Sequence, residues 1–245
     1  MYNHCIIMSS AYSIGKRIAL HYINLNEIEM KEKIDYLISR CGNDISLSTH
    51  YIMTEKDTWK SVVEFDKFFL DVKVMDDINT FVELILKDRE LTGLDVAKYI
   101  TSRCSCTHLK LEKLTYFCYA EYLCLKKEKL FNDTIYAYRL GPVIDSVYKK
   151  YRKKVFLKEE DNTMVYSDKE KSSAIKSRII ASKNGLDKLS VIEKTLKKYS
   201  QLKANELVNL THQYNSPWYI SGSGTSNNKV IEDKTIINNH KYEMI

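Results

Sequence analysis

The chain contains few of the residues that interrupt helices: only 2 prolines and 7 glycines occur among its 245 residues. Sandwiches and barrels need frequent turns, and turns depend heavily on these two residue types. The shortage argues against a loop-rich β-sandwich and favours helices. The sequence therefore predicts a mainly α protein with a small β element, in which a small α+β unit precedes a helical domain.

Long apolar runs are also missing. No segment reaches the roughly 18 consecutive apolar residues that a membrane-spanning helix needs. Residues 1–10 lack the basic start and the long apolar stretch of a secretory signal peptide. We therefore expect a cytoplasmic protein with no membrane contact, whose 6 cysteines remain reduced.

The sequence lacks the usual catalytic patterns, such as a glycine-rich phosphate loop. Cys104, Cys106 and His108 invite a zinc interpretation, but their spacing differs from the usual gap between ligands, and no second pair follows at finger spacing. His108, Asp133 and Thr211 could be combined into a catalytic set, yet no spacing supports it. We expect a protein that is not an enzyme and has no metal, cofactor or catalytic residue.

Charge is unevenly distributed along the chain. Residues 1–90 hold 11 basic against 15 acidic side chains, residues 91–160 hold 14 against 8, and residues 161–245 hold 13 against 9. An acidic first third joined to a basic remainder indicates two units with different faces. We take residues 1–88 as the first unit, whose role is not legible, and residues 89–220 as the second.

The basic residues are most concentrated in residues 148–154, which read YKKYRKK. Such a run could contact nucleic-acid phosphates or an acidic protein, or it could be the solvated face of a helix. As partner-binding residues the sequence predicts Tyr148, Lys149, Tyr151, Arg152 and Lys153.

Residues 1–88 carry the pattern of a small α+β unit. Apolar spacing predicts a helix over residues 26–40 that ends at Gly42, and a second over residues 78–87 that begins after two aspartates. Residues 50–54, 61–65 and 68–75 are rich in β-branched and aromatic side chains, so we expect strands there.

The remainder of the chain reads mainly as helices. Helices are expected over residues 91–101, 174–182, 187–199 and 204–213, and a long one begins near residue 111. In the long helix, apolar residues at 111, 114, 118, 122 and 125 define one face, and Lys110, Lys113 and Glu121 occupy other faces. Residues 156–173 read as a loop with a possible strand at 164–166, and residues 221–245 as a flexible tail.

Between the long helix and the basic run, residues 134–140 are β-like. Gly141 and Pro142 then break the chain, and Pro142 fits the first turn of a helix expected over residues 142–153. This pair could line a binding groove, although a turn explains it as well. Similarly, His212 and Trp218 could form a pocket or could pack a helix end.

Several short segments, taken in order, resemble the Panacea domain, the family of SocA-like antitoxins and phage-associated proteins. They read DVAKYI at 95–100, LKLEKLTYF at 109–117, LF at 130–131, AYRLGPV at 137–143, VYKKY at 147–151, LTH at 210–212 and PW at 217–218. The resemblance covers residues 94–219. The family-motif residues are Leu111, Lys113, Leu114, Tyr116, Gly141, Pro142, Val143, Thr211, His212, Pro217 and Trp218. Lys203, Tyr138 and Asp145 depart from the family pattern, which usually has a Ser or Thr cap, a Trp and a Pro there.

The resemblance implies a non-enzymatic antitoxin that binds and neutralises a cognate toxin protein and is carried by phages and mobile elements. Two alternatives stay open on the same fold. One is a phage-encoded inhibitor of a host defence nuclease, such as a CRISPR effector. The other is a DNA-binding autoregulator in which residues 91–114 form a helix-turn-helix and the basic helix touches nucleic acid. The partner and the oligomeric state remain unassigned.

Overall fold

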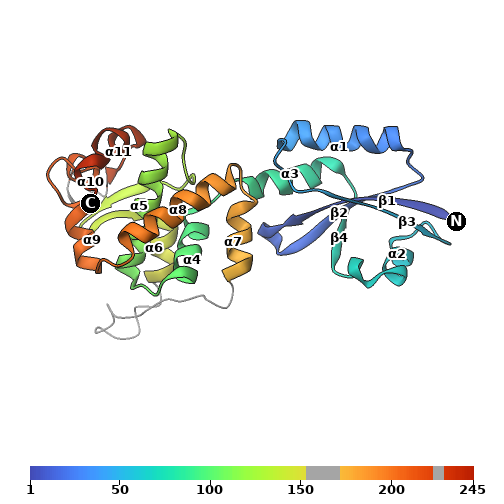
Figure 1. The fold of residues 1–245 in the computed structure, drawn as a ribbon, viewed down its shortest axis with the longest axis horizontal. Coiled ribbons are helices and arrows are strands. Elements are labelled where there is room, and N and C mark those ends of the chain that lie inside the picture. Colours follow the sequence, from blue (N-terminus) through green and yellow to red (C-terminus); the bar gives the residue numbers. More distant parts are fainter. Residues whose placement is uncertain (153–171, 223–228) are drawn as a thin grey trace. The chain divides into compact units, whose positions relative to one another are not determined.

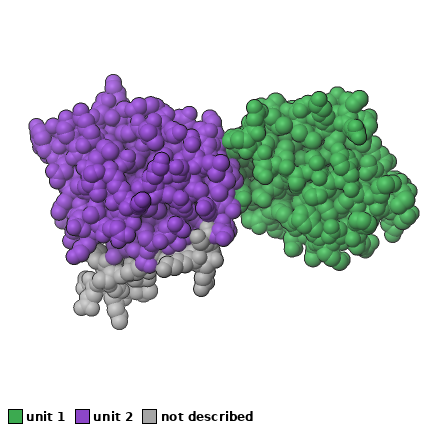
Figure 2. All heavy atoms as spheres, viewed as in Figure 1, with its two compact units in different colours: residues 1–90 green, residues 91–245 purple. Residues whose placement is uncertain are grey.

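The computed structural model describes residues 1–152, 172–222 and 229–245 (Figure 1). The chain divides into two compact units, Met1–Glu90 and Leu91–Ile245 (Figure 2). The described residues are mainly helical with small sheets, which confirms the predicted fold class. No helix among them has the length and apolar composition that crossing a bilayer requires.

A four-stranded sheet in the order β3-β1-β2-β4 forms the centre of the first unit. Strands β1 (Tyr2–Ala11), β2 (Lys16–Ile23) and β3 (Ser48–Thr54) pair antiparallel, and β4 (Val72–Met75) runs parallel to β2. Strands β1 and β2 were not predicted from the sequence. Both sheet faces are covered, so the side chains from His4 to Met8 are all buried and show no polar alternation.

Helices cover both faces of this sheet. Helices α1 (Glu27–Cys41) and α3 (Ile78–Arg89) pack on one face, and each begins at a predicted position, with Asn26 and Asp77 as side-chain caps. The other face carries α2 (Trp59–Phe65) and the 3-10 turn Lys67–Phe69. The strand predicted over residues 61–65 is wrong: Thr58 caps a helix there, and Val62 packs against the sheet.

Helix α5 (His108–Lys126) is the central element of the second unit. Helices α4 (Gly93–Arg103), α8 (Gly185–Tyr199), α9 (Ala204–Thr211) and α11 (Asp233–Asn239) and strand β6 (Gly141–Ile144) pack around it. All residues from Leu111 to Ala120 are consequently buried. The helix was predicted correctly, but the expectation of one apolar face was wrong, because Lys113 is buried and Leu125 is 64% exposed.

A three-stranded sheet in the order β6-β5-β7 lies beside α5, with β5 at Ile135–Tyr138 and β7 at Lys229–Val230. Pro142 lies in β6 opposite Ala137, so the prediction that it opens a helix is wrong. An edge strand tolerates the missing N–H of proline. Helix α6 begins later, at Asp145, and its described part extends to Arg152.

The remaining described elements complete the second unit. They are α7 (Ser172–Ile180), α10 (Pro217–Ile220) and the 3-10 turn His240–Tyr242. The loop and strand predicted within residues 156–171 lie outside the described residues. The flexible tail predicted for residues 221–245 does not match residues 229–245, which form β7, α11 and the final turn and bury Ile231 and Ile236. Ile231 and Ile236 alone do not form a periodic pattern from which a helix could be predicted. They are buried because they contact the rest of the second unit.

Candidate functional site

A buried lysine ties the central helix to the hairpin formed by β5 and β6. Lys113, in the middle of α5, is fully buried, and its Nζ donates a hydrogen bond to the carbonyl oxygen of Pro142 at 2.6 Å. Burial lowers the pKa of Lys113 to about 7, although the carboxyl groups of Glu112 and Glu243 act in the opposite direction. Lys113, a family-motif residue predicted to lie outside the apolar face of this helix, is therefore buried and anchors the hairpin.

The hairpin approaches this lysine so closely that only glycine fits at its turn. Gly141 has φ +104°, and a Cβ atom there would lie 2.7 Å from Thr211 Oγ1 and 2.9 Å from Lys113 Nζ. L-residues rarely adopt such a backbone conformation. Three family-motif residues that are far apart in the sequence thus lie next to one another: Lys113, Gly141 and Thr211.

Two buried carboxyl groups extend this network. Glu112 Oε2 accepts from the Ile144 N–H at 3.2 Å, and its Oε1 lies 3.6 Å from His108 Nε2. Glu243 Oε1 accepts from the Tyr116 hydroxyl at 2.6 Å and lies 2.8 Å from His240 Nδ1. Burial raises the pKa of Glu112 and of Glu243. The network holds both the β5–β6 hairpin and the C-terminal turn on α5.

The stability of the second unit should depend on pH through Lys113. Its folded pKa of about 7 lies below its ordinary value of 10.5, so the unfolded chain binds more protons between these values. Stability should therefore rise with pH over this window. In Lys113→Met this contribution disappears. Urea unfolding between about pH 7 and pH 9 should show a smaller slope for the variant.

The control for this measurement is Lys194→Met, at an exposed position of α8. It should keep the wild-type dependence on pH. Equal slopes in wild type and Lys113→Met would show that Lys113 is not the group responsible.

Above this buried network the hairpin and α6 form an aromatic surface, which we call the tyrosine platform: Tyr136, Tyr138, Tyr148, Lys149 and Arg152. The rings of Tyr136 and Tyr138 are 6.4 Å apart, and those of Tyr138 and Tyr148 are 5.3 Å apart. The Arg152 guanidinium lies 4.9 Å from the centre of the Tyr148 ring. The tyrosines are half-buried and the two cations are exposed.

Local periodicity explains which side chains reach this surface. In β5 the buried Ile135 and Ala137 alternate with Tyr136 and Tyr138, which therefore lie on the outer face. In α6, Val147 and Tyr151 face inward and are buried. Tyr148 is thus half-buried, and Lys149 and Arg152 are exposed.

The other two predicted partner-binding residues, Tyr151 and Lys153, are not part of this surface as the structure describes it. Tyr151 is 6% exposed and packs in the core, so its predicted contact with a partner does not fit this structure. Lys153 lies outside the described residues. Lys149 forms an ion pair with Asp145 at 2.6 Å, but both side chains are solvent-exposed, so a partner's carboxylate can compete for it.

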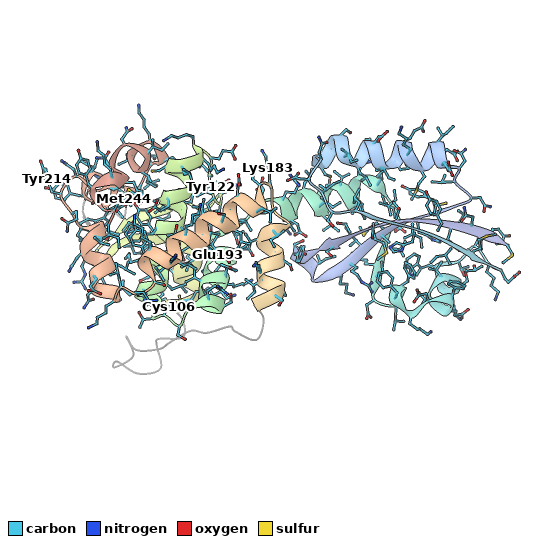
Figure 3. The ribbon with its side chains drawn as sticks, in the orientation of Figure 1. Cys106, Tyr122, Lys183, Glu193, Tyr214 and Met244 are labelled. Carbon is cyan, nitrogen blue, oxygen red and sulfur yellow. The ribbon has the colours of Figure 1, made fainter. Side chains whose placement is uncertain are left out.

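The β5–β6 hairpin is also held by His212 and Trp218, which contact its backbone. Their ring centres are 3.6 Å apart, the Trp218 indole N–H donates to the Tyr138 carbonyl oxygen at 2.7 Å, and His212 Nε2 lies 3.3 Å from the Arg139 carbonyl oxygen. Trp218 is 6% exposed. These contacts match a packed helix end rather than an open pocket. Nearby, Tyr214 projects into solvent against Tyr219 (Figure 3).

The possible catalytic set from the sequence has structural roles instead. The Asp133 carboxylate accepts from the Gly93 N–H at 2.8 Å and from the Ser146 hydroxyl, and Thr211 Oγ1 donates to the Val208 carbonyl oxygen. Within residues 1–152, 172–222 and 229–245, no group of three or more Cys, His, Asp or Glu side chains could hold a metal. The tyrosine platform is therefore suited to binding a partner through its aromatic rings and its two cations.

For the helix-turn-helix alternative, the N-terminal half of α5 offers DNA only its partly accessible first turn, residues 108–110. A recognition helix must present side chains to a DNA groove. The residues of α5 from Leu111 to Ala120 are all buried, which leaves that stretch no face for DNA.

Five residues that the structure brings into this site were not predicted as site residues: Tyr136, Tyr138, Glu112, His240 and Glu243. The alternating pattern Tyr-Ala-Tyr in a predicted strand could have indicated the two tyrosines. The buried carboxyl groups carried no signal, because acidic residues are almost always expected at the surface.

A family model described as antitoxin SocA-like, Panacea domain, matches residues 111–219, somewhat less than half of the chain. Comparisons with curated proteins and with solved structures give no match. The motif at residues 95–100, which we included in the resemblance, lies outside the matched range. The match supports an antitoxin-like role, and residues 111–219 of this chain are similar to the SocA-like Panacea domain.

Proposed function

We propose that this protein is an antitoxin that binds a cognate toxin protein through the tyrosine platform and blocks the toxin's active surface. The observation that carries the proposal is the juxtaposition of three half-buried tyrosines with Lys149 and Arg152. Tyrosine and arginine dominate the binding energy of many protein interfaces. The Panacea match supplies the expectation of a toxin as the partner.

The support beneath the platform favours a pre-organised binding surface. The backbone of the β5–β6 hairpin is held by Lys113 from inside and by the Trp218 indole at Tyr138. A surface that is already rigid loses little conformational entropy on binding. We therefore expect the antitoxin to bind without large rearrangement of its second unit.

Charge favours an acidic partner surface. Residues 91–245 contain 27 Lys and Arg against 17 Asp and Glu, and the platform adds two exposed cations to its aromatic rings. Opposite charge on the toxin would steer the encounter and make association sensitive to salt.

The experiment is co-expression with the product of the neighbouring open reading frame. Wild-type protein should rescue growth from that product and purify with it as a stoichiometric complex. The double variant Tyr148→Ala and Arg152→Ala removes two anchors from the platform. Its affinity for the toxin should fall about 30-fold or more, as measured by calorimetry or surface plasmon resonance.

A matched control removes two exposed cations elsewhere on the same unit, with Lys194→Ala and Lys197→Ala on α8. This variant should neutralise the toxin as wild type does. A neighbouring product that is harmless, or a platform variant with unchanged affinity, would contradict the proposal. Circular dichroism of each variant establishes that loss of binding does not reflect unfolding.

A further inference from the structure

The four-stranded sheet of the first unit ends in an edge strand without Lys, Arg, Asp or Glu. Strand β3 (Ser48–Thr54) reads STHYIMT and lies at one end of the order β3-β1-β2-β4. At the other end, β4 (Val72–Met75) is only 4 residues long and contains Lys73. Short length and charged side chains are the usual protection of a sheet edge against pairing with another chain. Strand β4 has this protection, and β3 lacks it.

The pairing of β1 shows which backbone groups of β3 face the open edge. The Asn3 N–H donates to the Asn24 side chain at 2.9 Å, and the Asn3 carbonyl oxygen accepts from the Asn24 N–H at 2.7 Å, so Asn3 faces β2. Successive residues of a strand direct these groups to opposite sides. The even-numbered residues of β1 therefore face β3, whose even-numbered residues lie opposite them. Thr49, Tyr51 and Met53 consequently direct their N–H and C=O groups away from the sheet.

The side chains of the same three residues are exposed. Tyr51 is 54% exposed and Met53 is 55% exposed, and Thr49 is exposed as well. Large apolar side chains on an unprotected edge strand are typical of a surface that binds another strand. Backbone donors, backbone acceptors and apolar side chains thus occur together along one edge of the first unit.

We propose that two copies of this chain pair through β3, antiparallel about a two-fold axis at Tyr51, so that their sheets become one continuous sheet. In this register Thr49 of each copy faces Met53 of the other, and the two Tyr51 side chains lie next to each other. The outward residues of the two strands form about six hydrogen bonds. A two-fold axis closes the assembly at a dimer.

Charge favours a second copy as the occupant of this edge. Residues 1–90 hold 11 basic against 15 acidic side chains, so two such units repel each other on average. Strand β3 adds no charge to this repulsion. Just beyond the strand, Glu55 faces Leu47 and Lys56 faces Ser46 of the second copy, so like charges do not oppose each other there. The pairing uses only the first unit and stands apart from the toxin binding that we propose for the second.

Sedimentation velocity of the full chain tests the pairing directly. Because two paired strands bury less area than a standard interface, we expect a Kd of about 10 μM. Between about 1 and 200 μM the mass should rise from 28.7 kDa toward twice this value. Amide exchange of Thr49, Tyr51 and Met53 should slow over the same range. A chain that stays monomeric throughout, or that forms assemblies larger than a dimer, would overturn the proposal.

Two opposite substitutions at the axis test the register. Tyr51→Lys and Tyr51→Glu each place like charges against each other, so each variant alone should lose at least about 30-fold in dimer affinity. An equimolar mixture of the two should recover the dimer, and a mixture that remains monomeric would contradict pairing at Tyr51. The matched control is Leu70→Lys, at a 61% exposed position just before β4, which should dimerise as wild type does. Dimerisation of Tyr51→Lys with wild-type affinity would also rule out this interface.

Discussion

Removal of residues 229–245 should destabilise the second unit by at least about 4 kcal/mol, although the sequence reads as a tail there. The deletion removes Ile231 and Ile236, which are 3% and 0% exposed. It also removes Glu243, the hydrogen-bond partner of the buried Tyr116 hydroxyl. Both losses act on α5, so we expect the whole unit to be affected rather than one edge of it.

The two tryptophans make the measurement specific to each unit, because Trp59 lies in the first and Trp218 in the second. In a Trp59→Phe background, fluorescence reports unfolding of the second unit alone. Ile236→Ala should reproduce much of the loss, and Ile245→Ala, at a 57% exposed position, should have little effect. An unchanged urea midpoint after the deletion would mean that these residues do not stabilise the unit.

Gly141→Ala should destabilise the second unit by about 3 kcal/mol or more. Two costs combine: the backbone has φ +104°, and the new Cβ would lie 2.7 Å from Thr211 Oγ1 and 2.9 Å from Lys113 Nζ. Relief requires moving the hairpin away from α5. The tyrosine platform would shift with it, so the toxin binding that we propose should weaken together with stability.

Gly15→Ala is a suitable control, because Gly15 has φ +63° but no atom within 4 Å of the added Cβ. It carries the conformational cost without the clash and should lose only about 1 kcal/mol. Trp59 fluorescence reports this loss in the first unit. If both variants lose the same free energy, crowding at Gly141 is not a factor.

The parts of the fold that could be predicted are those fixed by local sequence. Asn26 and Asp77 mark the starts of α1 and α3 because an N-cap acts within its own first turn. Residues 61–65 were misassigned because Val62 and Val63 favour strands, and the helical cap at Thr58 was outweighed. Tertiary contacts favour the helix at these residues, and the sequence of five residues does not show which tertiary contacts they make.

In the candidate site, too, local sequence predicts some features and tertiary contacts decide others. Tyr148, Lys149 and Arg152 could be predicted as accessible because a run of cations rarely lies in a core. Tyr151 could not be separated from Tyr148 in so short a helix, because its orientation depends on where α5 and the sheet lie. Lys113 is the extreme case, since its burial requires the Pro142 carbonyl oxygen, which is supplied by a segment about thirty residues away.

The pairing of β7 with β5 has a consequence for biosynthesis. On the edge of β5 that faces away from β6, Tyr136 pairs with Val230 and Ala137 with Lys229. While the ribosome is still making the intervening chain, the sheet lacks a strand and α5 lacks the cover of α11. Contacts between such distant segments form late and leave apolar surface open to proteases and chaperones in the meantime. A newly made molecule should therefore be short-lived until residues 229–245 emerge, and the supply of active protein should respond quickly to any change in the rate of translation.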